Sequence, residues 1–186
     1  MMFEQIISLD IQLFIFLNNV FSNPVFDYIM PLFHHTENWL IFIVFFWLYL
    51  CYSNKKFRWQ ILILTPLTII LCDQFGGFVK DFQLRNRPWV DLDANQIRHL
   101  VKQSGASLSF PSNHALNISG IAYFYSILMK KHQTSFWIFA LIIMYSRVYI
   151  GVHYPLDVLA GCIFGIIISK LTIITWNRLS NEKYYI

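Results

Sequence analysis

Residues 155–176 read PLDVLAGCIFGIIISKLTIITW, and the only charged residues among them are Asp157 and Lys170. A run of about 20 mostly apolar residues is long enough for a helix to cross the ~30 Å hydrocarbon core of a bilayer. The rest of the chain has the same character, because 56% of its 186 residues are hydrophobic and 13% are charged. Such a composition leaves too little polar surface for a soluble domain. The stretch therefore predicts a membrane-spanning helix.

Four further apolar stretches predict spans, at residues 38–52, 59–80, 112–129 and 134–150. The first would be only about 22 Å long at ~1.5 Å per residue, so we expect that helix to begin earlier, near His34. The chain contains no internal repeat and no linker long enough to divide it. We therefore expect a fold of the all-α class, a multi-span transmembrane helical bundle of about five spans that forms a single domain over residues 1–186.

The segment at residues 6–21 mixes apolar side chains with Asp10 and Asn18. This mixture predicts a helix that lies in the membrane interface, and a sixth span is the alternative. The residues before it lack the basic start of a secretory signal, so no cleavable segment is expected. The three cysteines lie within apolar stretches and lack the spacing of metal ligands, which predicts a packing role for Cys51, Cys72 and Cys162.

Basic residues gather in links at one end of the predicted bundle, and cytoplasmic loops are typically the basic ones. That end is therefore expected to face the cytoplasm of a multi-pass cell-membrane protein, here a bacterial inner membrane. Three polar patches fall at the opposite end, which places them on the periplasmic or extracellular face. The basic residues are Lys55, Lys56, Arg58, Lys130, Lys131, Arg178 and Lys183.

The first polar patch contains Lys80 and, seven residues later, Arg87 followed by Pro88. In a helix this spacing puts two cations on one face. Proline disfavours helix at the preceding residue, so Arg87 is expected to mark the point where the chain leaves the helix. A span end whose cations reach to lipid headgroups is the alternative. Asp73 extends the same face and is expected to be structural, as the partner of a basic group.

The second patch is the sequence PSNH at residues 111–114, which leads directly into an apolar run. Ser112 or Asn113 suits the position that caps a helix N-terminus. A helix start offers free backbone N–H groups and the positive end of the helix dipole, and both favour a bound anion. His114 would lie in the first turn, where it could donate a proton.

The third patch begins with Arg147 at the end of the fourth predicted span and continues at His153 and Asp157. In the first turn of the next helix, Asp157 could accept a hydrogen bond from one nitrogen of His153. The other nitrogen would then be free to act as a nucleophile. A purely structural cap is the alternative. Gly161 and Gly165 follow at four-residue steps and predict close helix packing behind the carboxylate.

Together the patches resemble the motifs of the type 2 phosphatidic acid phosphatase family, membrane lipid phosphatases that share their site with vanadium haloperoxidases and acid phosphatases. One departure is Asn113, where the family more often has glycine. Because asparagine tolerates unusual backbone angles, we expect its phosphate-binding amide to be retained. The three motifs occur in order over residues 80–157, as Lys80 with Arg87-Pro88, then Pro111-Ser112-Asn113-His114, then Ser146-Arg147 with His153 and Asp157.

The resemblance implies a phosphatase that needs neither metal nor cofactor. In it His153 would attack phosphorus and form a phosphohistidine, Asp157 would orient it, and His114 would protonate the leaving oxygen and then activate water. Cations and backbone donors around the developing charge can replace a metal. The groups implied to hold the phosphoryl oxygens are Lys80, Arg87, Ser112, Asn113 and Arg147.

A site at membrane depth predicts a lipid phosphate as substrate, with the loop from Trp89 to Ser109, including Arg98, His99 and Lys102, contacting its headgroup. The candidates are undecaprenyl pyrophosphate, phosphatidylglycerol phosphate, phosphatidic acid and lipid A. A lipid phosphotransferase with the same site remains an alternative, as do a transporter or channel and a vanadate-dependent haloperoxidase. The net charge of +4 is accounted for by the basic links and the site, so no nucleic-acid partner is expected, nor an obligatory protein partner.

Overall fold

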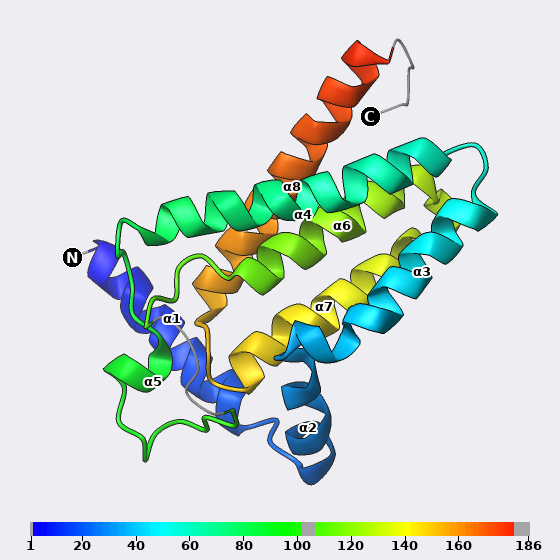
Figure 1. Ribbon diagram of the computed structural model, residues 1–186. Coiled ribbons are helices and arrows are strands. Elements are labelled where there is room, and N and C mark those ends of the chain that lie inside the picture. The colour runs from blue at the N-terminus through cyan, green and yellow to red at the C-terminus, as the bar shows by residue number, and fades with distance from the viewer. Residues whose placement is uncertain (1, 102–106, 181–186) are drawn as a thin grey trace.

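The protein is described by a computed structural model over residues 2–101 and 107–180 (Figure 1). This part of the chain is helical, and an isolated β-bridge joins Asn86 to Leu108. The expected all-α bundle is confirmed. Its elements are α1 (Met2–Asn19), α2 (Pro24–Ile29), η1 (Met30–Phe33), η2 (Thr36–Trp39), α3 (Leu40–Ser53), α4 (Arg58–Lys80), α5 (Pro88–Asp91), α6 (Asn113–Leu128), η3 (Lys130–His132), α7 (Gln133–Tyr149) and α8 (Pro155–Leu179).

Helices occupy all five places where spans are predicted. In the described part, three of them are long and apolar enough to cross a membrane: Thr36–Ser53, α4 and α8. The first begins at Thr36, two residues after His34, so the earlier start expected for this short span is confirmed. Helices α6 and α7 have 16 and 17 residues and are shorter than a typical span. Their crossing of the membrane stays a prediction.

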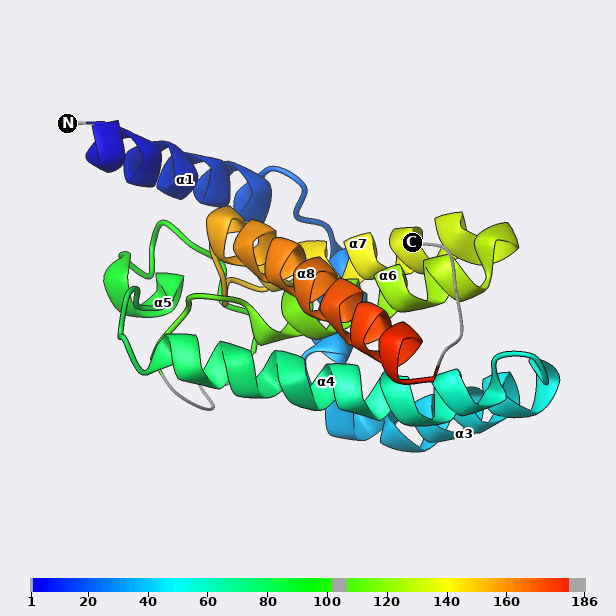
Figure 2. The same cartoon turned by 90° about the horizontal axis from the view of Figure 1, so that it is seen from above.

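Helices α3, α4, α6 and α7 run along one another, and α8 passes obliquely across α4 and α6 in both views (Figures 1 and 2). Glycines allow this close crossing. A Cβ atom built on Gly161 would lie 2.6 Å from the Ser112 carbonyl oxygen, and one on Gly165 would lie 2.2 Å from that of Leu116. The close packing predicted from the two glycines is confirmed, and it brings the start of α8 against the start of α6.

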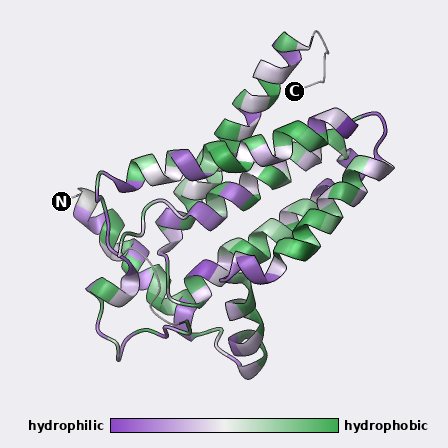
Figure 3. Ribbon diagram, in the orientation of Figure 1, coloured by the Kyte–Doolittle hydropathy of each residue, from purple (hydrophilic) through white to green (hydrophobic). Residues whose placement is uncertain are grey.

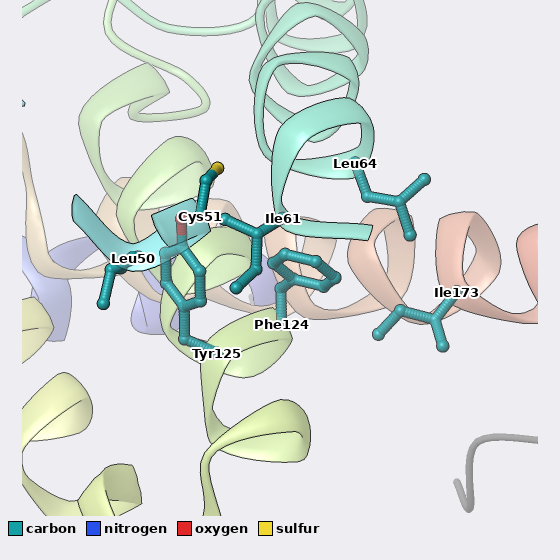
Figure 4. Packing of buried hydrophobic residues seen from close by; sticks show 7 residues of the cluster. All are labelled: Leu50, Cys51, Ile61, Leu64, Phe124, Tyr125 and Ile173. Atoms are coloured by element: carbon teal, nitrogen blue, oxygen red, sulfur yellow. The ribbon is translucent and has the colours of Figure 1, made fainter. Parts of the chain in front are cut away.

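One hydrophobic cluster closes the bundle at the end away from the polar patches. Its buried members come from α3, α4, α6 and α8 (Figure 4), and Phe57, Met129 and Trp176 pack against it. These three side chains lie in or beside the basic links and the C-terminal tail, so the described basic segments share one end, as expected. Lys183 lies outside the described residues. Which side of the membrane this end faces stays a prediction. The buried members are Leu50, Cys51, Ile61, Leu64, Phe124, Tyr125 and Ile173.

Side-chain polarity differs between the helices and the two ends of the bundle. Hydrophobic residues cover α3 and much of α4 and α7, whereas hydrophilic ones gather at the α3–α4 link and around α5 (Figure 3). All three cysteines are free thiols; two are buried and Cys162 is partly buried. This agrees with the packing role predicted for them.

Helix α1 buries one face, which includes two polar residues, and exposes apolar side chains on another. Asp10, Phe14 and Asn18 lie at four-residue steps and are buried, whereas Leu9 and Phe16 are 64% and 51% exposed. Exposed apolar side chains of this kind suit contact with lipid. Helix α1 and the segment Pro24–Phe33 that follows are bent by 102° relative to each other. The interfacial position of α1 stays a prediction, with half of a broken span as the alternative.

Candidate active site

The two cations of the first patch are not on one helical face, and that expectation is wrong. Helix α4 ends at Lys80, and the chain turns at Gln83, whose φ of 50° lies in the left-handed region that a continuing helix does not use. Arg87 instead caps the short helix α5, where Pro88 takes the first position. The turn brings Arg87 back over the segment before α6, where its Nε donates to the Leu108 carbonyl at 3.2 Å.

Lys80 is held by the second patch. Its Nζ donates to the Pro111 carbonyl at 2.8 Å and to the side-chain oxygen of Asn113. Gly76, one helical turn earlier in α4, leaves the room for this amide, because a Cβ atom there would lie 2.5 Å from Asn113 Oδ1. A glycine at position 113, which the family more often has, could not make the side-chain bond to Lys80. The departure at Asn113 therefore adds a contact to the lysine.

We predicted a basic partner for Asp73, but in the described part of the chain its carboxylate accepts hydrogen bonds from amides instead. Its Oδ1 accepts from Asn117 Nδ2 at 2.9 Å and from Asn113 Nδ2 at 3.4 Å. Lys80 lies on the same helix but uses its ammonium group on Pro111 and Asn113. A structural role for Asp73 is consistent with these bonds.

The second patch forms the start of α6, as expected. Ser112 is the N-cap, and its hydroxyl accepts from the Ala115 N–H at 3.4 Å. Its own backbone N–H donates to the Asp157 carbonyl at 3.1 Å, which ties this helix start to α8. His114 follows in the first turn, and its Nε2 is buried without a hydrogen-bond partner in the described part of the chain.

Arg147 is fully buried at the end of α7. Its Nε and Nη2 donate to the hydroxyl of Ser146 at 3.0 and 2.7 Å, whereas Nη1 finds no acceptor among the described residues. The ring of His34, from the segment after η1, lies nearly parallel to that of His114 with centroids 6.4 Å apart. Burial, together with the charge of Arg147, lowers the pKa of His34 to about 4. The neutral imidazole of His34 therefore lies beside that of His114, the residue predicted to donate a proton.

His153 and Asp157 lie together, but not in the direct contact that the sequence predicts. His153 Nδ1 is 3.7 Å from Asp157 Oδ2, which is too long for a hydrogen bond. The Ser109 hydroxyl lies between them, 3.2 Å from the histidine nitrogen and 2.5 Å from the carboxylate oxygen. Asp157 does cap α8 as expected, since Oδ2 also accepts from the Tyr154 N–H at 2.8 Å.

Burial of the ring favours the neutral imidazole of His153. Burial lowers its pKa to about 4, and the positive charges of Arg87 and Lys80 act in the same direction, although Asp157 opposes them. These interactions place both cations of the first patch near the histidine of the third. The structure thus brings all the sequence-predicted site residues to one end of the bundle, while their individual roles stay predictions.

Sequence reasoning missed residues that surround the site, chiefly Arg85, Asp10 and Ser109. The Arg85 guanidinium stacks over the Tyr154 ring, 3.5 Å from its centroid, and Nη1 lies 3.4 Å from Asp157 Oδ1. Arg85 stands two residues before Arg87, so its proximity to a motif was a usable signal. Asp10 is 75 residues away in sequence, and no spacing rule links it to the site.

The loop predicted to contact a headgroup is used partly for structure. Arg98 pairs with Asp27 at 2.5 Å, and His99 stacks on Trp89 with centroids 5.5 Å apart. Lys102 lies outside the described residues. Over residues 2–101 and 107–180, no group of three or more His, Cys, Asp or Glu side chains is placed to hold a metal ion.

A helical membrane bundle that gathers three cations, two histidines and a helix N-terminus at one end has the groups that a membrane phosphatase needs to bind and transfer a phosphoryl group. The family model described as the PAP2 superfamily matches residues 64–180, and the chain belongs to this superfamily.

Known proteins of similar sequence and fold agree with this membership. The lipid A 4'-phosphatase of Bacteroides thetaiotaomicron is 34% identical over 175 residues, which cover 88% of this chain and 75% of that protein. The crystal structure of Aquifex aeolicus LpxE superposes with a TM-score of 0.74 at 26% identity, covering 89% of this chain and 95% of that one. The crystal structure of the first transmembrane PAP2 type phosphatidylglycerolphosphate phosphatase from Bacillus subtilis superposes with a TM-score of 0.67 at 26% identity. The match covers 94% of this chain and 87% of that one. The expected enzyme class, a phosphatase acting on lipid phosphates, is confirmed.

Proposed function

We propose that the protein hydrolyses a phosphate monoester of a lipid A-type glycolipid, through a phosphohistidine intermediate and without a metal. The observation that carries the proposal is a pair of buried polar atoms without partners in the described structure, Arg147 Nη1 and His114 Nε2. Leaving a buried donor unpaired costs about 1–3 kcal/mol, which a bound phosphate oxygen would recover.

The proposed reaction has two steps. In the first, His153 Nε2 attacks phosphorus, the bond from phosphorus to the lipid oxygen breaks, and that oxygen takes a proton from His114. In the second, His114 removes a proton from water, the resulting hydroxide attacks phosphorus, and the phosphorus–nitrogen bond breaks. Lys80, Arg87 and Arg147 would bind the phosphoryl oxygens throughout. A forked guanidinium can contact two of these oxygens at once.

The choice of lipid rests on similarity. The relative described above as a lipid A 4'-phosphatase aligns with most of this chain and three quarters of its own length. Undecaprenyl pyrophosphate, phosphatidylglycerol phosphate and phosphatidic acid are the competing substrates, and the geometry of the site does not favour one of them. We therefore let similarity select the glycolipid and let a substrate panel test it.

The test is phosphate release by the purified protein in detergent with EDTA, across a panel of these four lipids. We expect release to survive EDTA, to be fastest with the lipid A-type monoester, and to vanish in His153→Ala. The matched control is His132→Ala, because this exposed histidine lies in η3 at the opposite end of the bundle.

Each part of the proposal has its own contradicting result. Turnover by a folded His153→Ala variant would remove this residue as the nucleophile. Loss of activity in EDTA that added metal restores would contradict the metal-free site. Faster release from another lipid would overturn the substrate assignment. Phosphorylated acceptor lipid in place of free phosphate would identify the alternative, a lipid phosphotransferase.

A further inference from the structure

Ser109 lies in the link that leads into α6, and its hydroxyl contacts Asp157 in the first turn of α8. Its side chain is fully buried. Its backbone N–H donates to the Arg85 carbonyl at 2.8 Å, next to the β-bridge between Asn86 and Leu108. The backbone of Ser109 is therefore held by a contact that does not depend on His153 or Asp157.

The two contacts of this hydroxyl determine where its proton lies. A serine hydroxyl has one donor and can accept through its lone pairs. The 2.5 Å separation from Asp157 Oδ2 is in the range of a hydroxyl that donates to a carboxylate. The proton of Ser109 is thus used on Asp157, so the contact of 3.2 Å with His153 must be one in which Nδ1–H donates to the serine oxygen.

This arrangement sets the tautomer of the histidine. With the proton on Nδ1, the lone pair of His153 lies on Nε2, the nitrogen required to attack phosphorus. Asp157 cannot fix the ring by itself, because the separation of 3.7 Å exceeds hydrogen-bond range.

We propose that Ser109 is a positioning residue, which bridges Asp157 to His153 and holds the imidazole in the tautomer and orientation needed for attack. The inference rests on the proposed phosphohistidine mechanism. When Nε2 forms its bond to phosphorus and the lipid oxygen leaves with the proton from His114, the imidazole becomes cationic. Its Nδ1–H stays in place, and the Asp157 charge stabilises the cation through the Ser109 hydroxyl. No proton passes through the serine.

The experiment compares Ser109→Ala, Ser109→Thr and Ser119→Ala with the wild type. Rapid-quench measurements on a radiolabelled lipid phosphate give the rate of phosphoenzyme formation, and steady-state assays give kcat, KM and inhibition by inorganic phosphate. Ser119, in α6, is the matched control because it is also buried and its hydroxyl also donates, in its case to the Leu116 and Cys162 carbonyls. At metal sites, loss of a group that orients a ligating histidine costs about 10- to 100-fold, and we take the same scale for the orientation of His153.

We expect phosphoenzyme formation to slow by about 10- to 100-fold in Ser109→Ala, with KM and phosphate inhibition unchanged. Ser109→Thr, which keeps the hydroxyl, should form the phosphoenzyme faster than Ser109→Ala, and Ser119→Ala should match the wild type. Wild-type rates in Ser109→Ala would overturn the proposal, as would equal losses in the alanine and threonine variants or a matching loss of phosphate affinity. A phosphohistidine mechanism that fails altogether is recognised separately, by turnover in His153→Ala.

Discussion

Arg85 and Asp10 form a buried ion pair, with Nη1 2.6 Å from Oδ2, that joins the loop after α4 to helix α1. Their side chains are 13% and 2% exposed. The other oxygen of Asp10 accepts from the Leu156 N–H at 2.9 Å, in the first turn of α8. Since Arg85 also approaches Asp157, the N-terminal helix is connected to the carboxylate behind the proposed nucleophile.

Asp10→Ala should therefore destabilise the fold as well as the site. Removing one partner of a buried ion pair costs about 3–5 kcal/mol, because the other charge stays buried without compensation. We expect a clear fall in Tm in detergent, with a loss of kcat at temperatures where the variant is folded. Glu37→Gln is the control, because the His35–Glu37 pair is exposed and its removal should leave Tm unchanged. A wild-type Tm in Asp10→Ala would show that α1 is not held through this pair.

The Arg147 guanidinium should not be replaceable by an ammonium. Ser146 occupies two of its nitrogens, and the third is the one proposed to bind phosphate. Lysine cannot make both sets of contacts, and loss of one such donor costs about 100- to 1000-fold in rate. We expect Arg147→Lys to lose activity on this scale in phosphate-release assays, whereas Arg58→Lys at the opposite end should not. Retained kcat/KM in the Arg147 variant would exclude a phosphate contact by the fork.

The fold was largely predictable because hydropathy alone locates membrane helices. All five apolar stretches are helical, and Gly161 and Gly165 correctly indicated a close helix crossing. Exact ends were harder to place. Hydropathy ended the second span at Lys80, but nothing indicated the turn that follows, because the sequence around Gln83 carries no glycine or proline.

The site was predictable where its residues form compact motifs and not where they come from distant segments. Ser112 and Asp157 act as helix caps, a role that local sequence specifies. Ser109 stands two residues before Pro111, so its proximity to the second motif was a usable signal, whereas Asp10 reaches the site only through tertiary packing, which no spacing rule describes. The direct His153–Asp157 bond was predicted from the place of Asp157 in the first turn of its helix, and the inserted serine hydroxyl replaces it.

The acid limb of the pH–activity profile should lie below the pKa of an ordinary histidine. Burial lowers the pKa of His153 from 6.5 to about 4, so the neutral nucleophile persists as the pH falls through 6.5 and is lost only near pH 4. We expect the limb of kcat/KM that reports this residue to lie near pH 4. A phosphomonoester itself titrates at about pH 6, so the profile is measured on two substrates that differ in phosphate pKa. An acid limb fixed near 6.5 for both would contradict the prediction.

Gly165 should be among the positions least tolerant of a methyl group. A Cβ atom there would lie 2.2 Å from the Leu116 carbonyl oxygen and 2.3 Å from Ser119 Oγ, so α8 would have to move away from α6. Overpacking of this kind costs about 1–3 kcal/mol. Gly77 in α4 is the control, because a Cβ atom there meets nothing within 4 Å, and alanine in a helix is favoured over glycine by about 0.5–1 kcal/mol. Gly165→Ala should lower Tm in detergent and Gly77→Ala should not.

Because α8 carries Asp157 and α6 carries His114, the same displacement would separate these residues, and activity should fall even where Gly165→Ala is folded. Equal Tm and activity in the two variants would mean that the two helices do not need this contact to hold the site.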